Sequence, residues 1–183
     1  MLPSLIGIIA SSGGAAAAGD YESIATVTVG SGGSSSISFT SIPSTYQHLQ
    51  VRAIQRCSSG VNNLQMQLNS DTGNNYSTHR LGGTGEGVFA DATTSTSGMK
   101  LGLTGLATST FGATIVDLLD YANVNKYKTV RSLNGFDENG VRGYILLTSG
   151  LWMNTNAVTS ITIYPSADSF QQYSSFALYG IKG

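Results

Sequence analysis

The stretch GYILLTSGLWMNTNAVTSITIYPSADSFQQYSSFALYGIKG, residues 143–183, decides the fold class. Successive residues alternate in three segments, 144–149, 160–164 and 176–179, and turn-forming Gly, Asn, Pro and Asp separate these segments. A period of two places one row of side chains in a core and the other row outward. We therefore predict three strands whose outward row is mostly Thr, Ser and Tyr, a face suited to meet another protein.

The same pattern extends toward the N-terminus. We expect further strands at 21–29, 36–40, 48–57, 64–68, 76–81, 99–103, 113–119 and 126–133. The expected core rows include Ile37 and Phe39, then Leu49, Val51 and Ala53, then Leu64, Met66 and Leu68. A long loop at 82–97 and a turn at 134–140, which contains Asn-Gly twice, interrupt the pattern. No window shows sustained helical periodicity with caps, so we predict an all-β, antiparallel β-sandwich, jelly-roll-like, formed by one domain at 20–183.

The composition restricts the partners of the chain. Of its 183 residues, only 10% are charged, against roughly 25% in an average soluble domain. The net charge of -1 gives no basic excess, so we expect no nucleic-acid partner. A weakly charged surface favours association, and we predict a homo-oligomer, with a trimer among the candidate symmetries. The single cysteine, Cys57, excludes an intrachain disulfide and a multi-cysteine zinc site.

Residues 1–19 form a separate N-terminal segment in this prediction. The apolar run MLPSLIGIIA is far shorter than the ~20 residues of a membrane-spanning helix, and we expect no membrane partner. A signal peptide and a frayed terminus are two alternatives, although no Lys or Arg precedes the run. The preferred hypothesis is an anchoring arm on a Gly/Ala tether, because apolar side chains are costly to leave in water. The candidate anchoring residues are Leu2, Leu5, Ile6, Ile8 and Ile9.

The titratable residues form no recognisable catalytic or metal-binding motif. His48 and His79 lie in predicted strands and lack ligand spacing. Asp117 and Asp120 are three residues apart, so in a strand they point to opposite faces and do not form a facing carboxylate pair. The glycine-rich segment 82–87 is not followed by a helix, which a phosphate loop requires. We predict that the chain is not an enzyme, with no catalytic residue, metal ion or cofactor.

Aromatic residues are the remaining candidates for contacts. The chain has nine tyrosines and one tryptophan, and such side chains stack on sugars or form the centres of protein interfaces. We name Trp152, Tyr164 and Tyr173 as candidate interface or glycan-contact residues. The alternative is that each packs at a sheet edge with its polar group in water.

Four segments carry a resemblance to a known family: SISFTSIPSTYQHLQVR (36–52), NNYSTHRLGGTG (74–85), SGLWMNTNAVTSITIYP (149–165) and FQQYSSFALYGIKG (170–183). They resemble small virion proteins of tailed bacteriophages, including marine and cyanobacterial phages, over roughly residues 21–183. The combination of FTSIP-x-TY with the ending ALYGIK is fairly specific for this family, and it specifies no chemistry. The resemblance implies a non-enzymatic structural role for a β-sandwich exposed on a virion that is assembled in the host cytoplasm.

Three functional hypotheses follow from these observations. The favoured one is a capsid decoration or cement protein that contacts other virion proteins, such as the major capsid protein, through protein–protein contacts. The second is a neck or tail-fibre module that binds host-surface glycan through exposed aromatic residues. The third, a glycan-degrading enzyme, lacks the pair of convergent acids that such enzymes need.

Overall fold

The computed structural model describes residues 20–105, 109–140 and 142–183. Within these ranges the regular secondary structure consists of β-strands alone, as the sequence predicts. The twelve strands are β1 (Tyr21–Thr28), β2 (Ile37–Phe39), β3 (His48–Gln55), β4 (Asn63–Leu68), β5 (Tyr76–Gly83), β6 (Val88–Thr96), β7 (Met99–Leu103), β8 (Gly112–Leu119), β9 (Lys128–Asp137), β10 (Gly143–Trp152), β11 (Ile161–Pro165) and β12 (Ser175–Ile181).

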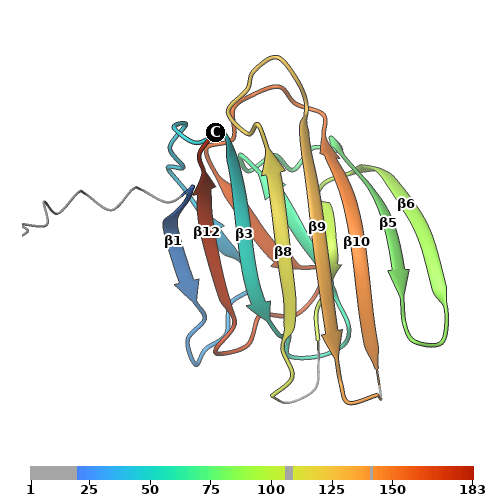
Figure 1. Ribbon diagram of the computed structural model, residues 1–183. Coiled ribbons are helices and arrows are strands. Elements are labelled where there is room, and N and C mark those ends of the chain that lie inside the picture. The colour runs from blue at the N-terminus through green and yellow to red at the C-terminus, as the bar shows by residue number, and fades with distance from the viewer. Residues whose placement is uncertain (1–19, 106–108, 141) are drawn as a thin grey trace, which may run out of the picture.

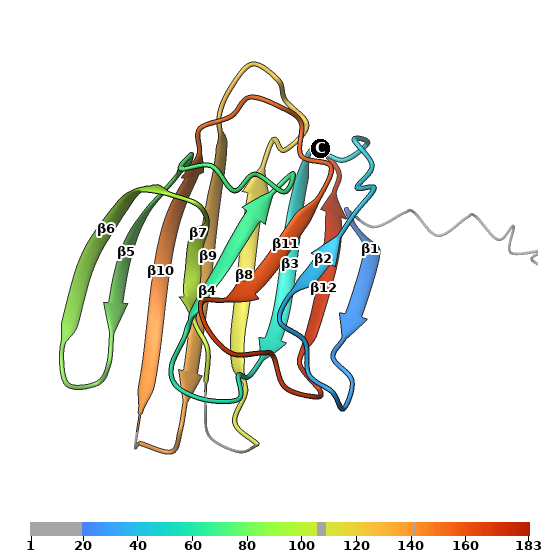
Figure 2. The same ribbon diagram turned by 180° about the vertical axis from the view of Figure 1, so that it is seen from behind.

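The strands form two sheets in two layers (Figures 1 and 2). The larger sheet has eight strands in the order β1-β12-β3-β8-β9-β10-β5-β6, and the smaller has four in the order β2-β11-β4-β7. Neighbouring strands in both sheets are antiparallel, so the predicted antiparallel β-sandwich is confirmed. The jelly-roll detail is not confirmed, and the strands divide into eight and four. The predicted N-terminal arm lies outside the described residues.

The core lies between the two sheets and follows the predicted rows. Leu49, Val51 and Ala53 of β3 and Leu64, Met66 and Leu68 of β4 are buried in the same hydrophobic cluster. Ile37 and Phe39 of β2 complete the smaller sheet's inner face. Each large aliphatic side chain buried here contributes roughly 1.5–3 kcal/mol. The alternation predicts these rows because the inward positions of each strand carry the larger apolar residues.

Two segments differ from the prediction. Residues 88–96 of the expected loop form β6, which pairs with β5 from Gly83↔Val88 to Tyr76↔Thr96. The first of the two Asn-Gly pairs, at 134–135, lies inside β9, and only the second, at 139–140, falls at the β9–β10 turn. Asn139 and Gly140 both have positive φ, as such a turn requires. Asn134 instead faces the core, where side-chain hydrogen bonds retain it in the strand.

The outward row of β10 corrects a third expectation. Leu146 and Thr148 are buried, whereas Ile145, Leu147 and Ser149 face outward. The exposed row of this strand is therefore largely apolar, and a hydroxyl lies on the core side. In β11 and β12 the buried rows are the apolar ones that the sequence predicts.

The smaller sheet covers only one face of the larger sheet. Figure 1 views the larger sheet from the opposite side, and no element lies in front of β8, β9 and β10. On the covered side, Arg80 of β5 donates to Asp91 of β6 through Nε (2.9 Å) and Nη2 (2.6 Å) and to Asn63 Oδ1 of β4 (3.1 Å). The hydrogen bonds from Arg80 hold the pKa of Asp91 below its usual value. Through Arg80, these contacts hold the edge strand β6 against β5 and link both strands to β4 of the smaller sheet. The uncovered face of the larger sheet therefore continues as far as β6.

Candidate functional site

The uncovered outer face of the larger sheet carries a row of apolar side chains that crosses five strands. Each member lies directly opposite its neighbour in the strand register, so the row runs perpendicular to the strands. In order from β6 to β8 it consists of Ala90, Leu81, Leu147, Leu133 and Ile115. Because opposed side chains in a sheet lie about 4.5–5.5 Å apart, these residues form one continuous ridge.

A second apolar row runs beside the first, two residues further along each strand. It contains Val88 on β6, Ile145 on β10, Ala113 on β8 and Ile54 on β3, with glycines at the intervening positions of β5 and β9. The large side chains of the two rows from Leu81 to Ile54 retain 43–62% of their surface exposed, and Val88 retains 86%. Soluble monomers seldom expose a contiguous apolar surface of this extent. We call these two rows the apolar outer face.

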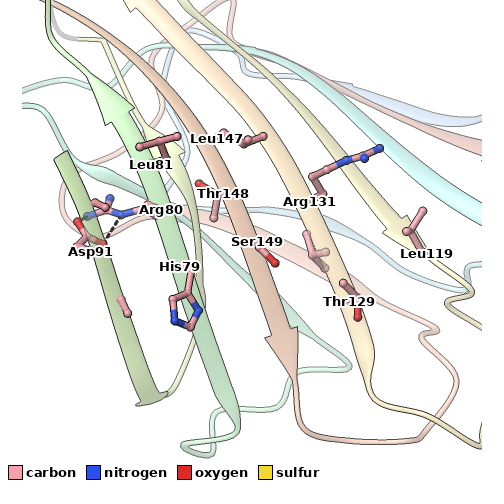
Figure 3. A pocket seen from close by; sticks show the side chains of 13 residues that line it. His79, Arg80, Leu81, Asp91, Leu119, Thr129, Arg131, Leu147, Thr148 and Ser149 are labelled. Atoms are coloured by element: carbon pink, nitrogen blue, oxygen red, sulfur yellow. Dashed lines mark hydrogen bonds and ion pairs between the residues drawn. The ribbon is translucent and has the colours of Figure 1, made fainter. Parts of the chain in front are cut away.

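The outer surface is hollowed where it crosses β6, β5, β10, β9 and β8. The hollow has a volume of about 770 Å³, and Figure 3 shows Leu81 and Leu147 at one end, with Leu119 and Arg131 on the neighbouring strands. His79 and Ser149 belong to the polar row that borders the apolar outer face on this side. The hollow is open to solvent along the sheet surface, so it suits a large partner.

The polar row that borders the apolar outer face is already internally paired. Arg131 Nη2 donates to Asp117 Oδ2 at 3.0 Å, and Gln50 Nε2 donates to Asp117 Oδ1 at 2.8 Å. Arg52 Nε in turn donates to Gln50 Oε1 at 2.8 Å. The Arg52 guanidinium also lies 5.4 and 5.1 Å from the centres of two rings, those of Tyr21 and Tyr179. A hydrogen-bonded chain of this kind holds the polar side chains in place. Asp117 compensates Arg131, whereas Arg52, opposite Ile115 on β3, lies over the two tyrosine rings.

The titratable side chains of the described ranges bear on a metal site and on the carboxylate pair Asp117 and Asp120. No group of three or more His, Cys, Asp or Glu side chains in the described ranges is placed to hold a metal ion. Asp117 lies on the outer face with Arg131, whereas Asp120 lies beyond the end of β8, paired with Lys126 and next to His48. The two carboxylates therefore have different partners. In the same ranges, no helix is long and apolar enough to cross a membrane.

Trp152 corrects the prediction of a surface aromatic. Its side chain is only 1% exposed and stacks at 6.4 Å on Tyr76 in the core. Its indole Nε1 donates to Asp71 Oδ2 at 2.8 Å. The tryptophan is therefore an element of the core. Polar atoms of the 69–75 turn satisfy its N–H group, which an alternation pattern does not reveal.

Tyr164 and Tyr173, the other predicted aromatic residues, lie apart from the apolar outer face. Tyr164 is in the outward row of the smaller sheet, where burial raises the pKa of its hydroxyl, and Tyr173 is 70% exposed in the connection before β12. The candidate anchoring residues Leu2, Leu5, Ile6, Ile8 and Ile9 lie outside the described residues.

The sequence does contain a signal for the apolar outer face. In β8 both rows carry aliphatic side chains, Val116 and Leu118 inward and Ile115 and Leu119 outward. A strand that is apolar on both faces is typical of a sheet that is covered on both sides. Weighing both rows of each strand, instead of assigning the outward row by its hydroxyls, identifies this surface.

Acid should weaken the hydrogen bonds between the Asp71 carboxylate and its donors, which include the indole N–H of Trp152. Burial raises the pKa of Asp71, but hydrogen bonds from Trp152, Asn75 and the Gly73 N–H outweigh it and lower the pKa below 3.8. A lowered folded-state pKa gives stability that is present above the unfolded value and lost as the pH falls through the folded value. We expect Asp71→Asn to lower the free energy of unfolding by about 1 kcal/mol at pH 7 and by less near pH 3.

Urea unfolding at both pH values, followed by Trp152 fluorescence, tests this expectation. Asp137→Asn is the control, because this carboxylate is exposed and accepts a hydrogen bond from the Gly140 N–H within its own turn. An Asp71→Asn deficit that does not shrink in acid contradicts the assigned role of the carboxylate.

Comparisons of the chain with protein-family models, with curated proteins and with solved structures each find no match.

Proposed function

We propose that the chain is a non-enzymatic structural protein of a bacteriophage virion. The role that we favour is that of a capsid decoration or cement subunit. The observation that carries this proposal is the apolar outer face, which offers two rows of aliphatic side chains across six strands of the larger sheet. A surface of this kind is suited to contact protein, because its apolar centre is bordered by a polar row. The resemblance of the four sequence segments supports the assignment to a virion.

The position of the surface also supports a structural role. The apolar outer face lies on regular strands whose opposite face forms the core, so its side chains have a rigid backing. Rigid, broad and shallow surfaces lose little conformational freedom when they associate. The low charge of the chain adds to this, since few charges need to be desolvated on contact.

The structure weakens the second hypothesis, a neck or tail-fibre module that binds host glycan. That hypothesis requires an exposed aromatic cluster, and Trp152 is buried. Tyr173 is exposed, but it lies in a connection before β12, away from the tryptophan that the hypothesis combines with it.

Cryo-electron microscopy of particles of the encoding phage tests the proposed function. Many copies distributed over the head, in contact with the major capsid protein, are the expected result. A few copies at the neck or tail tip would instead favour the fibre hypothesis. Absence of the chain from purified particles would overturn a virion role.

A further inference from the structure

We propose that a second copy of this chain covers the apolar outer face, so that two larger sheets pack face to face around a two-fold axis. This inference rests on the proposed function, because it names the partner of the surface to which that function is assigned. The resulting four-layer pair would be the unit that attaches to the particle. Four observations support the second copy as the occupant.

The first observation is the extent of the surface. The apolar outer face and its polar border span six strands, from β3 to β6, which at about 4.8 Å per strand covers roughly 25–29 Å. With the next outward row beyond the polar border, that of Leu119 and Thr129, four successive rows along the strands add roughly 20–27 Å in the other direction. The resulting footprint of roughly 500–800 Å² approaches the ~800 Å² that each partner buries in a stable, specific interface.

The second observation is the distribution of charge. In an isologous pair the same surface meets itself, so a face of one net sign would repel its copy. Here the two rows from β8 to β6 are aliphatic or glycine, and Asp117 compensates Arg131 in the polar border. Pairing therefore buries no uncompensated charge at the centre, and the charged groups that remain lie toward the rim, as in known interfaces.

The third observation is the shape. A β-sheet twists, so its face is a saddle that is concave along one diagonal and convex along the other. A saddle of this kind is complementary to its own copy when a two-fold axis runs along the strands, because the concave diagonal of one then meets the convex diagonal of the other. Sheets in sandwiches pack in this aligned way, with mean strand directions within about 30° and a separation of about 10 Å. The hollow near Leu81 and Leu147 is the concave part of this surface.

The fourth observation is the match between rows. With the two-fold axis along the strands, each apolar row meets the same row of the partner, and each polar border meets a polar border. Leu147 and Leu133 are central in the first row and Ile145 in the second, so these three side chains are expected at the middle of the interface. Fully desolvated residues near the centre dominate the affinity of an interface.

Sedimentation equilibrium of the purified full-length chain tests the inference. We expect a concentration-dependent equilibrium between one and two chains, with the dimer dominant at micromolar concentration. Leu147→Lys and, separately, Leu133→Lys should raise the dissociation constant at least about 100-fold, because each places an unpaired ammonium in an apolar interface. Circular dichroism should remain close to that of the wild type, since both side chains point away from the core. The midpoint of urea unfolding should also match when it is measured at a concentration at which the wild type is monomeric, because dimerisation itself stabilises the folded chain.

Val124→Lys is the matched control. Val124 is 60% exposed in the turn between β8 and β9, and Leu147 is 49% exposed, so both variants exchange an exposed aliphatic residue for the same charge. The control should associate as the wild type does. A second comparison uses the full chain with both Ile6→Asp and Ile8→Asp. This double variant tests whether the chains associate through the N-terminal segment.

Three outcomes would overturn the inference. A wild-type chain that is monomeric up to about 100 μM has no pairing of useful strength. Association that survives Leu147→Lys and Leu133→Lys but is lost with the Ile6 and Ile8 substitutions places the contact in the N-terminal segment. A species of three chains excludes the two-fold pair. Failure of the pairing is distinguishable from failure of the proposed function, because the first is measured with purified protein and the second by its presence in particles.

Discussion

Replacing Lys128 by Met should lower the free energy of unfolding by about 3 kcal/mol. Lys128 opens β9 and is fully buried, and its Nζ donates to three backbone carbonyls. These are Asn123 O at 2.7 Å, Lys126 O at 3.0 Å and Thr155 O at 2.9 Å. The first two carbonyls belong to the β8–β9 turn and the third to the β10–β11 connection, so one ammonium joins two loops at the same end of the sandwich.

The expected magnitude comes from two opposing effects. A hydrogen bond to a charged group contributes about 1.5–3 kcal/mol, and three of them exceed the loss that we expect. The desolvation of the ammonium reduces their net contribution, and this burial lowers the pKa of Lys128 from 10.5. Methionine removes both the hydrogen bonds and the desolvation cost, while its thioether chain fills most of the space and leaves three carbonyls without their donor.

Lys126→Met is the control for this prediction. Lys126 is two residues away, its side chain is 53% exposed, and it pairs with Asp120 at the surface. Exposed ion pairs of this type contribute about 0–1 kcal/mol, so the control should unfold close to the wild type. The single tryptophan, Trp152, is buried and reports unfolding by fluorescence in urea. Equal stability of the two variants would show that water satisfies the three carbonyls and that Lys128 does not join the loops.

The alternation of apolar and polar residues predicted those parts of the fold that depend on residues close together in the sequence. The buried rows of β3 and β4 follow from alternation alone, because Leu49 and Leu64 belong to rows in which every second residue is apolar. The role of Lys128 does not follow, since an isolated lysine at the start of a strand normally faces water. Its burial depends on Thr155, 27 positions later in the chain, and no local period encodes such a contact.

The candidate site was only partly predictable for a related reason. The sequence predicted that the C-terminal strands present a surface for another protein, but it assigned that surface to hydroxyls. In β10 the hydroxyl of Thr148 faces the core, and Ile145 and Leu147 face outward. Which row is buried depends on which side of the larger sheet the smaller sheet covers, and that choice depends on the connections between strands. The alternation fixes the two rows, and the tertiary structure decides between them.

The prediction of a turn at Asn134 leads to the second large effect. Asn134 lies in β9, faces the core and is 1% exposed. Its Oδ1 accepts from the Leu103 N–H at 2.8 Å, and its Nδ2 donates to Leu103 O at 3.0 Å and to Thr114 Oγ1 at 2.8 Å. The side chain therefore bonds both backbone groups of one residue in β7. The close approach of Gly102 to Asn134 shows how tightly β7 of the smaller sheet lies against β9.

We expect Asn134→Leu to lower the free energy of unfolding by about 3 kcal/mol, because it leaves an amide and a carbonyl of β7 unpaired inside the core. Leucine has a similar volume, so most of the loss is attributed to hydrogen bonding. Asn125→Leu is the control, since Asn125 is exposed in the β8–β9 turn. Similar urea-unfolding curves for the two variants would show that packing alone holds β7 in place.

The same variant connects the core to the apolar outer face. Leu133 directly precedes Asn134 and lies on the opposite side of β9, so Asn134 holds from behind the strand that positions this central side chain. Loosening β7 should allow β9 more motion and weaken pairing between copies, with a smaller change in the dissociation constant than Leu133→Lys causes. Sedimentation equilibrium under folding conditions measures this difference. Unchanged association in a clearly destabilised Asn134→Leu variant would show that the outer face keeps its geometry without this support, and that the larger sheet is rigid in its own right.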